Sequence, residues 1–219
     1  MQIDNISIIY LGHSSFIIEA DGKTIYIDPY VLPASPEKAD FIFVSNEHFD
    51  HAGIEQEKAI RKNGTVLYGS TGAVKKFAYG NPVAPGIRID NGISVDVVEA
   101  YNINKSRDGV LYHPKGLGVG FVFNIDGRRI YFAGDTDFIP EMSDLGNIDV
   151  AMLPIGGRFT MDVKEAAEAA KTIKPKILIP MHYNSDRYGI QGLQASVGDL
   201  VLELSGTNTT VSALEPLVK

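Results

Sequence analysis

The stretch 45–53 places metal-binding side chains close together. Within four residues it supplies His48, Asp50 and His51, directly after the apolar run 41–44, which predicts a buried strand. Two imidazoles and a carboxylate at this spacing suit a borderline-soft divalent cation such as Zn or Mn. A polar surface turn is the alternative, and for a single histidine beside a single aspartate it would be the better interpretation.

The distribution of histidine along the chain favours the metal site. The chain has five histidines, and each lies at or just after the end of a predicted strand. Scattered surface histidines would not be distributed in this way. The five are His13, His48, His51, His113 and His182.

Two aspartates end predicted strands in the same manner. Asp28 follows the run 24–27 and precedes a proline, and Asp135 follows the run 128–133 and Gly134. Taken alone, Asp28 could be a hydrogen-bonded turn residue and Asp135 a helix cap, so both become candidates only together with the histidines.

Composition excludes several classes of site. The chain of 219 residues is 44% hydrophobic and 21% charged, which is typical of one globular domain spanning 1–219. It has no cysteine, which excludes disulfides and thiolate ligands. The net charge of −7 argues against nucleic acid as a partner. No leader and no long apolar run is present, so we expect a cytoplasmic protein without membrane contact.

The order of the predicted elements indicates an α/β (α+β) fold. Short strands come first in series and then alternate with helices, which favours sheet layers covered by helices. The clearest helix spans 162–173, with Asp162 and Glu165 as a capping box. A second helix is expected over 190–204, and residues 101–117 are expected to form a long loop.

These pieces together resemble the metallo-β-lactamase superfamily, whose first motif is His-x-His-x-Asp-His. Several neighbouring motifs look like the branch of metal-dependent hydrolases that includes ascorbate-6-phosphate lactonase. The resemblance runs nearly end to end. It is carried by Asn46-Glu47-His48-Phe49-Asp50-His51, His113, Gly134-Asp135-Thr136 and His182, with Leu11-Gly12-His13-Ser14-Ser15-Phe16, His113-Pro114-Lys115-Gly116, Pro154-Ile155-Gly156-Gly157 and Ile179-Pro180-Met181-His182-Tyr183 around them.

The resemblance implies a four-layer αββα sandwich with a metal site at one edge of the two sheets. It implies one ion held by the first-motif histidines and His113. It implies a second ion held by Asp50, His51 and His182, with Asp135 bridging the two. A metal-activated water would act as the nucleophile, and Asp50 would manage the proton.

The sequence departs from the family motif at Asn46, where histidine is expected. An amide oxygen is a weak ligand for Zn, so the first site keeps only His48 and His113 as strong ligands of its own. We therefore expect one or two ions, with the second site favoured. One subclass of metallo-β-lactamases is similar in carrying asparagine at the matching position and working with a single zinc.

Five other residues are candidates for supporting the ligands or contacting substrate. Asp28 could hydrogen-bond a ligand imidazole. His13 is either such a residue or a buried structural histidine. Lys115 and Arg158 could meet an anionic substrate group, with an ordinary surface charge as the alternative, and Tyr183 could face either the pocket or the core.

Two functions fit these features. The first is a metal-dependent hydrolase acting on a small-molecule substrate, namely an ester, a lactone or a phosphorylated metabolite. The second is a non-catalytic metal-binding or ligand-sensing protein on the same scaffold, which the loss of histidine at position 46 would suit. A homo-oligomer is compatible with either function.

Overall fold

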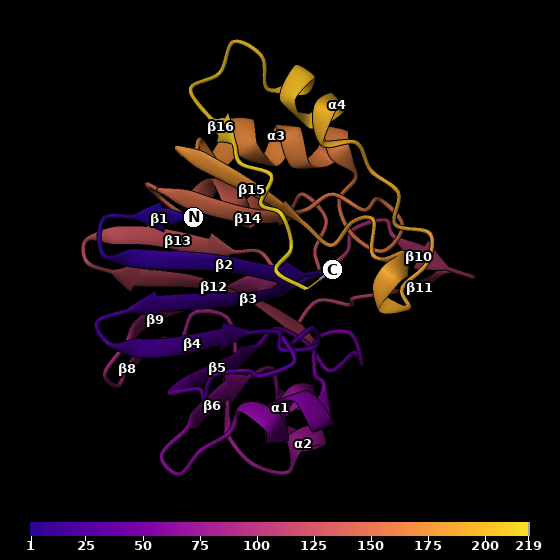
Figure 1. The fold of residues 1–219 in the computed structure, drawn as a ribbon. Coiled ribbons are helices and arrows are strands. Elements are labelled where there is room, and N and C mark those ends of the chain that lie inside the picture. The colour runs from indigo at the N-terminus through magenta and orange to yellow at the C-terminus, as the bar shows by residue number, and fades with distance from the viewer. Residues whose placement is uncertain (219) are drawn as a thin grey trace.

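Two seven-stranded sheets form the centre of the molecule. The computed structural model describes residues 1–218 (Figure 1). The first sheet contains, in spatial order, β1 (Gln2–Ile3), β2 (Ile6–Gly12), β3 (Ser15–Ala20), β4 (Lys23–Ile27), β5 (Phe41–Val44), β6 (Val66–Gly69) and β7 (Asn81–Pro82). The second contains β16 (Thr210–Val211), β15 (Ile177–Met181), β14 (Val150–Pro154), β13 (Arg128–Phe132), β12 (Gly118–Ile125), β9 (Ser94–Ala100) and β8 (Arg88–Asp90).

Both sheets are mixed and are built in the same way. In the first, β2, β3 and β4 pair antiparallel, and β4, β5 and β6 pair parallel. In the second, β9, β12 and β13 pair antiparallel, and β13, β14 and β15 pair parallel. The antiparallel hairpins turn at Asp21-Gly22 and Asp126-Gly127, where both residues have positive φ, as a two-residue type I′ turn requires.

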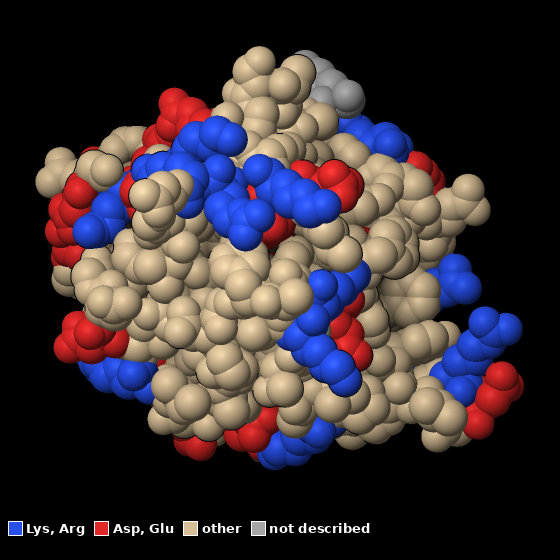
Figure 2. All heavy atoms as spheres, turned by 90° about the horizontal axis from the view of Figure 1, so that it is seen from below, with Lys and Arg blue, Asp and Glu red and all other residues tan. Residues whose placement is uncertain are grey.

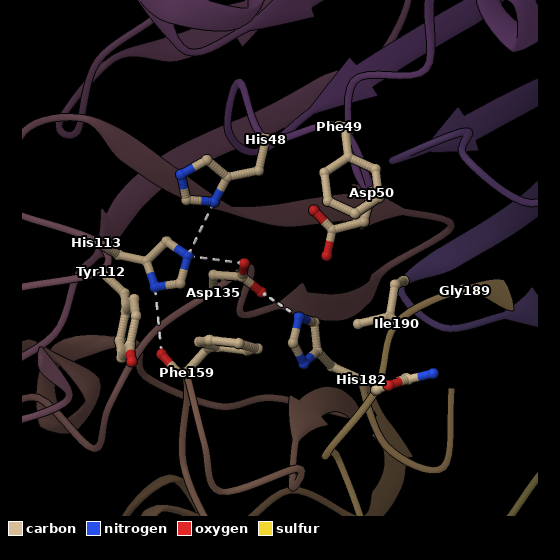
Figure 3. A pocket seen from close by; sticks show the side chains of 11 residues that line it. His48, Phe49, Asp50, Tyr112, His113, Asp135, Phe159, His182, Gly189 and Ile190 are labelled. Atoms are coloured by element: carbon tan, nitrogen blue, oxygen red, sulfur yellow. Dashed lines mark hydrogen bonds and ion pairs between the residues drawn. The ribbon is translucent and has the colours of Figure 1, made fainter. Parts of the chain in front are cut away.

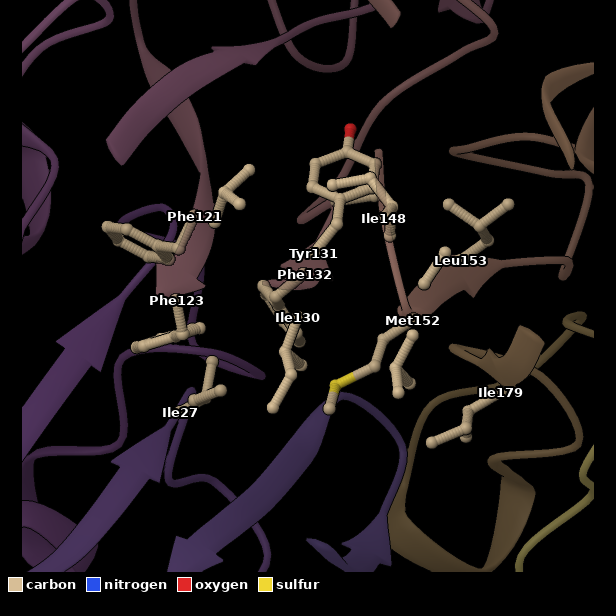
Figure 4. Close-up of a cluster of buried hydrophobic side chains, with 14 of the residues drawn as sticks. Ile27, Phe121, Phe123, Ile130, Tyr131, Phe132, Ile148, Met152, Leu153 and Ile179 are labelled. Carbon is tan, nitrogen blue, oxygen red and sulfur yellow. The ribbon is translucent and has the colours of Figure 1, made fainter. Parts of the chain in front are cut away.

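The main core lies between the two sheets. Alternate residues of each strand point into it, as the two-residue period of a strand dictates. The ring of Phe43 on β5 lies 5.2 Å from that of Phe121 and 4.9 Å from that of Phe123, both on β12. The rings of Phe16 and Phe132 make a further contact at 6.1 Å between the sheets. Figure 4 shows part of this cluster.

Helices cover the outer side of each sheet. Ile42 and Val44, the other face of β5, form a second cluster with Ile60 of α1 (Ile54–Ile60) and Ala73 of α2 (Thr71–Phe77). Helix α3 (Val163–Ile173) contacts β14 and α4 (Val197–Glu203). Figure 1 shows α3 and α4 at one end of the molecule and α1 and α2 at the other. The expected αββα sandwich is therefore confirmed.

Local signals predicted some elements well and others poorly. The capping box is present, since Asp162 Oδ1 accepts from the Glu165 amide and Glu165 Oε2 accepts from the Asp162 amide, both at 2.9 Å. The long loop carries a ribbon of β10 (Ser106–Arg107) and β11 (Val110–Leu111). Two 3₁₀ turns, η1 (Pro140–Asp144) and η2 (Asp186–Tyr188), complete the elements of residues 1–218.

The expected helix over 190–204 is wrong in its first half. Only Val197–Glu203 is helical. Gly192 has φ +80°, and the side chain of Asn184 bonds both the amide and the carbonyl of Ala195 at 3.1 Å, which holds this segment as a loop. Within residues 1–218, no helix is long and apolar enough to cross a membrane.

Candidate metal centre

Loops at one edge of both sheets bring the predicted ligands together. His13 follows β2, Asp28 follows β4, and the 45–52 loop follows β5. On the second sheet, Asp135 follows β13 and His182 follows β15. Five segments that are far apart in sequence therefore converge.

The 45–52 loop is held in shape by hydrogen bonds within itself. The amides of His51 and Ala52 donate to the carbonyl of His48, at 3.1 and 2.8 Å. Asn46 Oδ1 accepts from the amide of His48 at 2.9 Å, while its Nδ2 donates to Ser45 Oγ at 3.2 Å. The Asn46 side chain thus holds the turn that presents His48, and its amide oxygen is already used within the loop.

One group of potential ligands contains four buried side chains, whose donor atoms all lie within 4.8 Å of one another: His13, Asp50, His51 and His182. Nε2 of His13 is 3.1 Å from Asp50 Oδ2, and Nε2 of His51 is 3.9 Å from the same oxygen. His13, which the family motif leaves out of the ligand set, lies within this group.

A second group contains three side chains within the same limit: His48, His113 and Asp135. His113 Nε2 lies 3.2 Å from His48 Nδ1 and 3.0 Å from Asp135 Oδ2 (Figure 3). Asp135 also touches the first group, because its Oδ2 is 3.0 Å from His51 Nε2 and its Oδ1 is 3.2 Å from His182 Nε2. Asp135 therefore joins the two groups.

The turn that delivers Asp135 depends on glycine. Gly134 has φ +67°, and a Cβ atom at this position would lie 2.8 Å from the carbonyl oxygen of Val119. Any other residue would be strained by the backbone conformation and would clash with the neighbouring strand.

Other side chains orient the imidazoles. Asp28 Oδ2 lies 2.7 Å from His51 Nδ1, the hydrogen bond to a histidine that the sequence predicted, and Asp28 also accepts from the amide of Ser45 at 2.7 Å. Asn102 Oδ1 accepts from His113 Nδ1 at 3.0 Å. Such contacts leave Nε2 of each ring directed toward the centre, as outer partners of metal ligands do.

Asp137, the second aspartate after Gly134, has a structural role and belongs to neither ligand group. Its Oδ1 accepts from the Asn102 amide group at 2.9 Å, and its Oδ2 accepts from the backbone amides of Ile103 and Asn104 at 2.7 and 3.0 Å. It therefore holds the loop that positions Asn102.

The groups perturb one another electrostatically. Burial would raise the pKa of Asp135, but the nearby imidazoles of His182, His51 and His113 outweigh it and hold this pKa well below its ordinary value. Burial would lower the pKa of His51, yet Asp135 and Asp28 raise it well above normal. Burial dominates at His182 and lowers its pKa to about 3.

The donor atoms fit a divalent cation. Nε2 of His51 and Oδ1 of Asp135 are buried and make no hydrogen bond within the described chain. Buried polar atoms are nearly always satisfied, so these atoms call for a missing partner. Imidazole nitrogen and carboxylate oxygen are ligands that Zn and Mn accept, and the sites require no sulfur.

Backbone strain marks the same place. His13, Asp28 and His182 have φ of +54°, +45° and +55°, a backbone region that residues other than glycine seldom adopt. The His182 amide donates to the His13 carbonyl at 2.8 Å, which ties two of these residues together. Such strain persists only where the surroundings over-determine it, commonly at functional sites.

A cavity of about 370 Å³ opens onto both groups. It is lined by His48, Phe49, Asp50, Tyr112, His113, Asp135, Phe159, His182, Gly189, Ile190 and Gln191. Sequence reasoning missed Phe49, Tyr112, Phe159 and Ile190, because isolated apolar residues in loops look the same whether they line a cavity or a core.

Three candidate substrate contacts are absent from the lining of this cavity, and each takes up the alternative that the sequence left open. Lys115 is ion-paired with Glu141 at 2.6 Å. The Arg158 guanidinium lies over the ring of Phe159, 5.0 Å from its centroid. Tyr183 packs against the main core, the alternative that its sequence left open.

Comparison with known proteins agrees with this geometry. Residues 7–182 match the model of the beta-lactamase superfamily domain. A UPF0173 metal-dependent hydrolase of Nanoarchaeum equitans is 40% identical over 185 residues, which are 80% of this chain and 83% of that protein. A UPF0173 metal-dependent hydrolase of Thermococcus onnurineus is 36% identical over 191 residues, 80% of this chain and 84% of the relative.

Solved structures give the same result. A protein of Parabacteroides distasonis described as a metal-dependent hydrolase superposes with a TM-score of 0.87 at 32% identity, covering 98% of this chain and 94% of that one. Igni18, a metallo hydrolase of Ignicoccus hospitalis, has a TM-score of 0.78 at 27% identity, covering 96% and 95%. The chain therefore belongs to the beta-lactamase superfamily, within its group of metal-dependent hydrolases.

Proposed function

We propose that this hydrolase acts on a small ester, a lactone or a phosphorylated metabolite, using a water activated between the two ligand groups. The observation that carries the proposal is the position of Asp135, which joins the four-residue and three-residue groups at the floor of the cavity. A bound Zn or Mn ion supplies a polarised substrate oxygen and a water of lowered pKa.

Asp50 is the proposed proton carrier. Its side chain lines the cavity and keeps 12% of its surface exposed, so a water and a leaving group can both reach it. Although burial raises its pKa, the neighbouring His51 and the hydrogen bond with His13 lower the pKa below normal. Asp50 is therefore ionised at neutral pH, and its place in the cavity lets it accept the proton of the attacking water and return it to the leaving group.

We propose that the ion is held more tightly by the four-residue group than by the three-residue group. The former offers His13, Asp50, His51 and His182, all buried, whereas the latter includes the exposed His48. Asn46 adds little to the weaker group, because its amide oxygen accepts from the His48 amide. Full occupancy by a second ion would require Asp135 to be a ligand in both groups.

The substitution Asp50→Asn tests the hydrolase. We expect metal-reloaded protein to hydrolyse at least one member of a panel of neutral esters, lactones and phosphorylated metabolites. Losing the proton carrier should lower kcat by about 10²- to 10⁴-fold. Asp126→Asn is the matched control, since Asp126 is exposed in a hairpin turn where asparagine is equally favourable.

The alternative is a non-catalytic metal-binding or ligand-sensing protein, which the absence of histidine at position 46 favours. Under this alternative the unmodified protein binds metal without turnover on the panel, and Asn46→His creates activity. Under the proposal, activity is present in the unmodified protein and depends on Asp50. The sequence motifs resemble a lactone-hydrolysing branch, so lactones are included among the substrates to test.

A further inference from the structure

The cavity has a largely apolar lining beside the ligand groups. Phe49, Tyr112, Phe159 and Ile190 form its wall (Figure 3). The rings of Tyr112 and Phe159 pack edge to face, with centroids 4.8 Å apart and an interplanar angle of 88°. Phe49 is 61% exposed on the loop that also presents His48 and Asp50, although exposing so large an apolar side chain has a cost in water. A ligand that covers it would recover that cost.

The cavity offers no cationic side chain to an anionic substrate. Within the chain that the structure describes, no lysine or arginine lines it. Lys115, one candidate from the sequence, is paired with Glu141 and Glu99. Arg158 lies against the ring of Phe159, and its Nη1 reaches the Gln191 carbonyl at 3.5 Å.

Positive charge lies elsewhere on the molecule. Figure 2 shows lysine and arginine side chains gathered on the face seen from below. Lys58, Arg61 and Lys62, at the end of α1 and just beyond, are each paired with a carboxylate. A phosphoryl group that is not itself the reacting group normally needs arginine, lysine or helix amides. The polar residues of the lining other than the ligands are the uncharged Gln191 and Tyr112.

We propose that the substrate is an uncharged carboxylic ester or lactone carrying an aromatic or branched apolar group, and that this group lies on the wall of Phe49, Tyr112, Phe159 and Ile190. This inference rests on the proposed hydrolase function and narrows its substrate class. The water oxygen adds to the acyl carbon and the bond from that carbon to the alkoxy oxygen breaks. The alkoxy oxygen takes a proton, giving a carboxylic acid and an alcohol, or a hydroxy acid from a lactone.

Esters that differ only in their acyl group test the proposal. Metal-reloaded protein is assayed, by titration of the acid released, with the methyl esters of 3-phenylpropionate, acetate and hemisuccinate, and with 6-phosphogluconolactone. We expect kcat/KM for the phenylpropionyl ester to exceed that for the anionic hemisuccinate by about ten- to a hundredfold, the range that pocket contacts supply. Higher kcat/KM for hemisuccinate or for the phosphorylated lactone would overturn the substrate class while leaving the hydrolase intact.

Variants of the wall locate the effect. Phe159→Ala should lower kcat/KM for the phenylpropionyl ester about tenfold and change that for the acetyl ester little, because acetate does not reach the wall. Ile190→Lys should move the preference toward hemisuccinate. The control is Val201→Ala, which removes a 49% exposed apolar side chain on α4, outside the cavity lining. Equal losses on both esters in Phe159→Ala would contradict the proposal.

Binding separates failure of this inference from failure of the hydrolase. If neither the esters nor the phosphorylated lactone is turned over, the proposed function fails, and thermal shifts with 4-phenyl-2-butanone and glycerol 3-phosphate still decide which class of ligand the cavity binds. Stabilisation by the ketone that is lost in Phe159→Ala supports the apolar wall. Stabilisation by glycerol 3-phosphate beyond that from inorganic phosphate, with none from the ketone, rejects it.

Discussion

Asp28 Oδ2 lies 2.7 Å from Nδ1 of His51, and the same ring directs its Nε2 at Asp135 Oδ2, 3.0 Å away. Because Asp28 accepts the hydrogen on Nδ1, the Nε2 atom is the one available to a cation. A buried carboxylate behind a histidine also increases the basicity of that histidine as a ligand. The position of Asp28 outside the cavity lining makes this effect separable from substrate contact.

Asp28→Asn should therefore weaken metal binding by about 10- to 100-fold, because asparagine can still accept the hydrogen bond but carries no charge. Competition titration against a chelator of known affinity measures the change. The control Asp126→Asn should bind metal as the unmodified protein does. An unchanged affinity in Asp28→Asn would mean that His51 is not a ligand.

The two ligand groups should respond differently to loss of a histidine. His182→Ala or His13→Ala removes a buried member of the four-residue group, whereas His48→Ala removes the exposed member of the other group. We expect the first two variants to lose the ion retained after mild chelation, with affinity lowered at least about tenfold, and His48→Ala to retain it. Elemental analysis after dialysis measures the ion content. Retention in both His13→Ala and His182→Ala would place the tight ion with His48 and His113.

Asn46→His should raise the ion content of reloaded protein from about one per chain toward two, because it restores an imidazole to the weaker group. The same change removes the hydrogen bond from the His48 amide to Asn46 Oδ1, so metal-free protein should lose about 1 kcal/mol of stability. Elemental analysis and denaturant unfolding of metal-free protein measure the two effects. An ion content that stays at one would show that position 46 does not limit the weaker group.

Local and contiguous features were predictable from the sequence. The hairpin at Asp21-Gly22 and the cap at Asp162 need only neighbouring residues, and both are present. The cluster of His48, Asp50 and His51 was visible because one loop carries all three. The sandwich followed from the order of the elements and from the family resemblance, since each strand alone would suit many sheets.

Contacts between distant segments were not predictable. His13 contacts Asp50, which is 37 residues away in sequence, and Ser185, which is 172 residues away. The residues next to His13 in sequence therefore do not indicate that it belongs to the cluster. The charge of Lys115 was visible, but its partner Glu141, 26 residues further on, was not. The 190–204 segment was expected to be a helix, yet Asn184 holds its first half as a loop through tertiary contacts that outweigh propensity.

Metal binding should release about one proton per ion at pH 7, and the source should be His51. Its pKa in the metal-free protein lies well above 6.5 because, although burial lowers it, Asp135 and Asp28 raise it more strongly, so the ring is protonated and must lose a proton to bind. His182, with a pKa of about 3, is already neutral. Calorimetry in buffers of different ionisation enthalpy counts the protons, and the control Asp126→Asn should release the same number.

The same protonation fixes the sign of the pH dependence. The raised pKa of His51 stabilises metal-free protein fully below about pH 6.5, and this contribution is lost as the pH rises through the folded-state pKa. Bound metal competes with that proton, so the rise in Tm on adding metal should grow between pH 6 and pH 9. Asp28→Asn removes one of the charges that raise the pKa of His51. The pKa should therefore be lower in this variant, and proton release at pH 7 should fall. A Tm rise that shrinks with increasing pH would contradict a cation bound at His51.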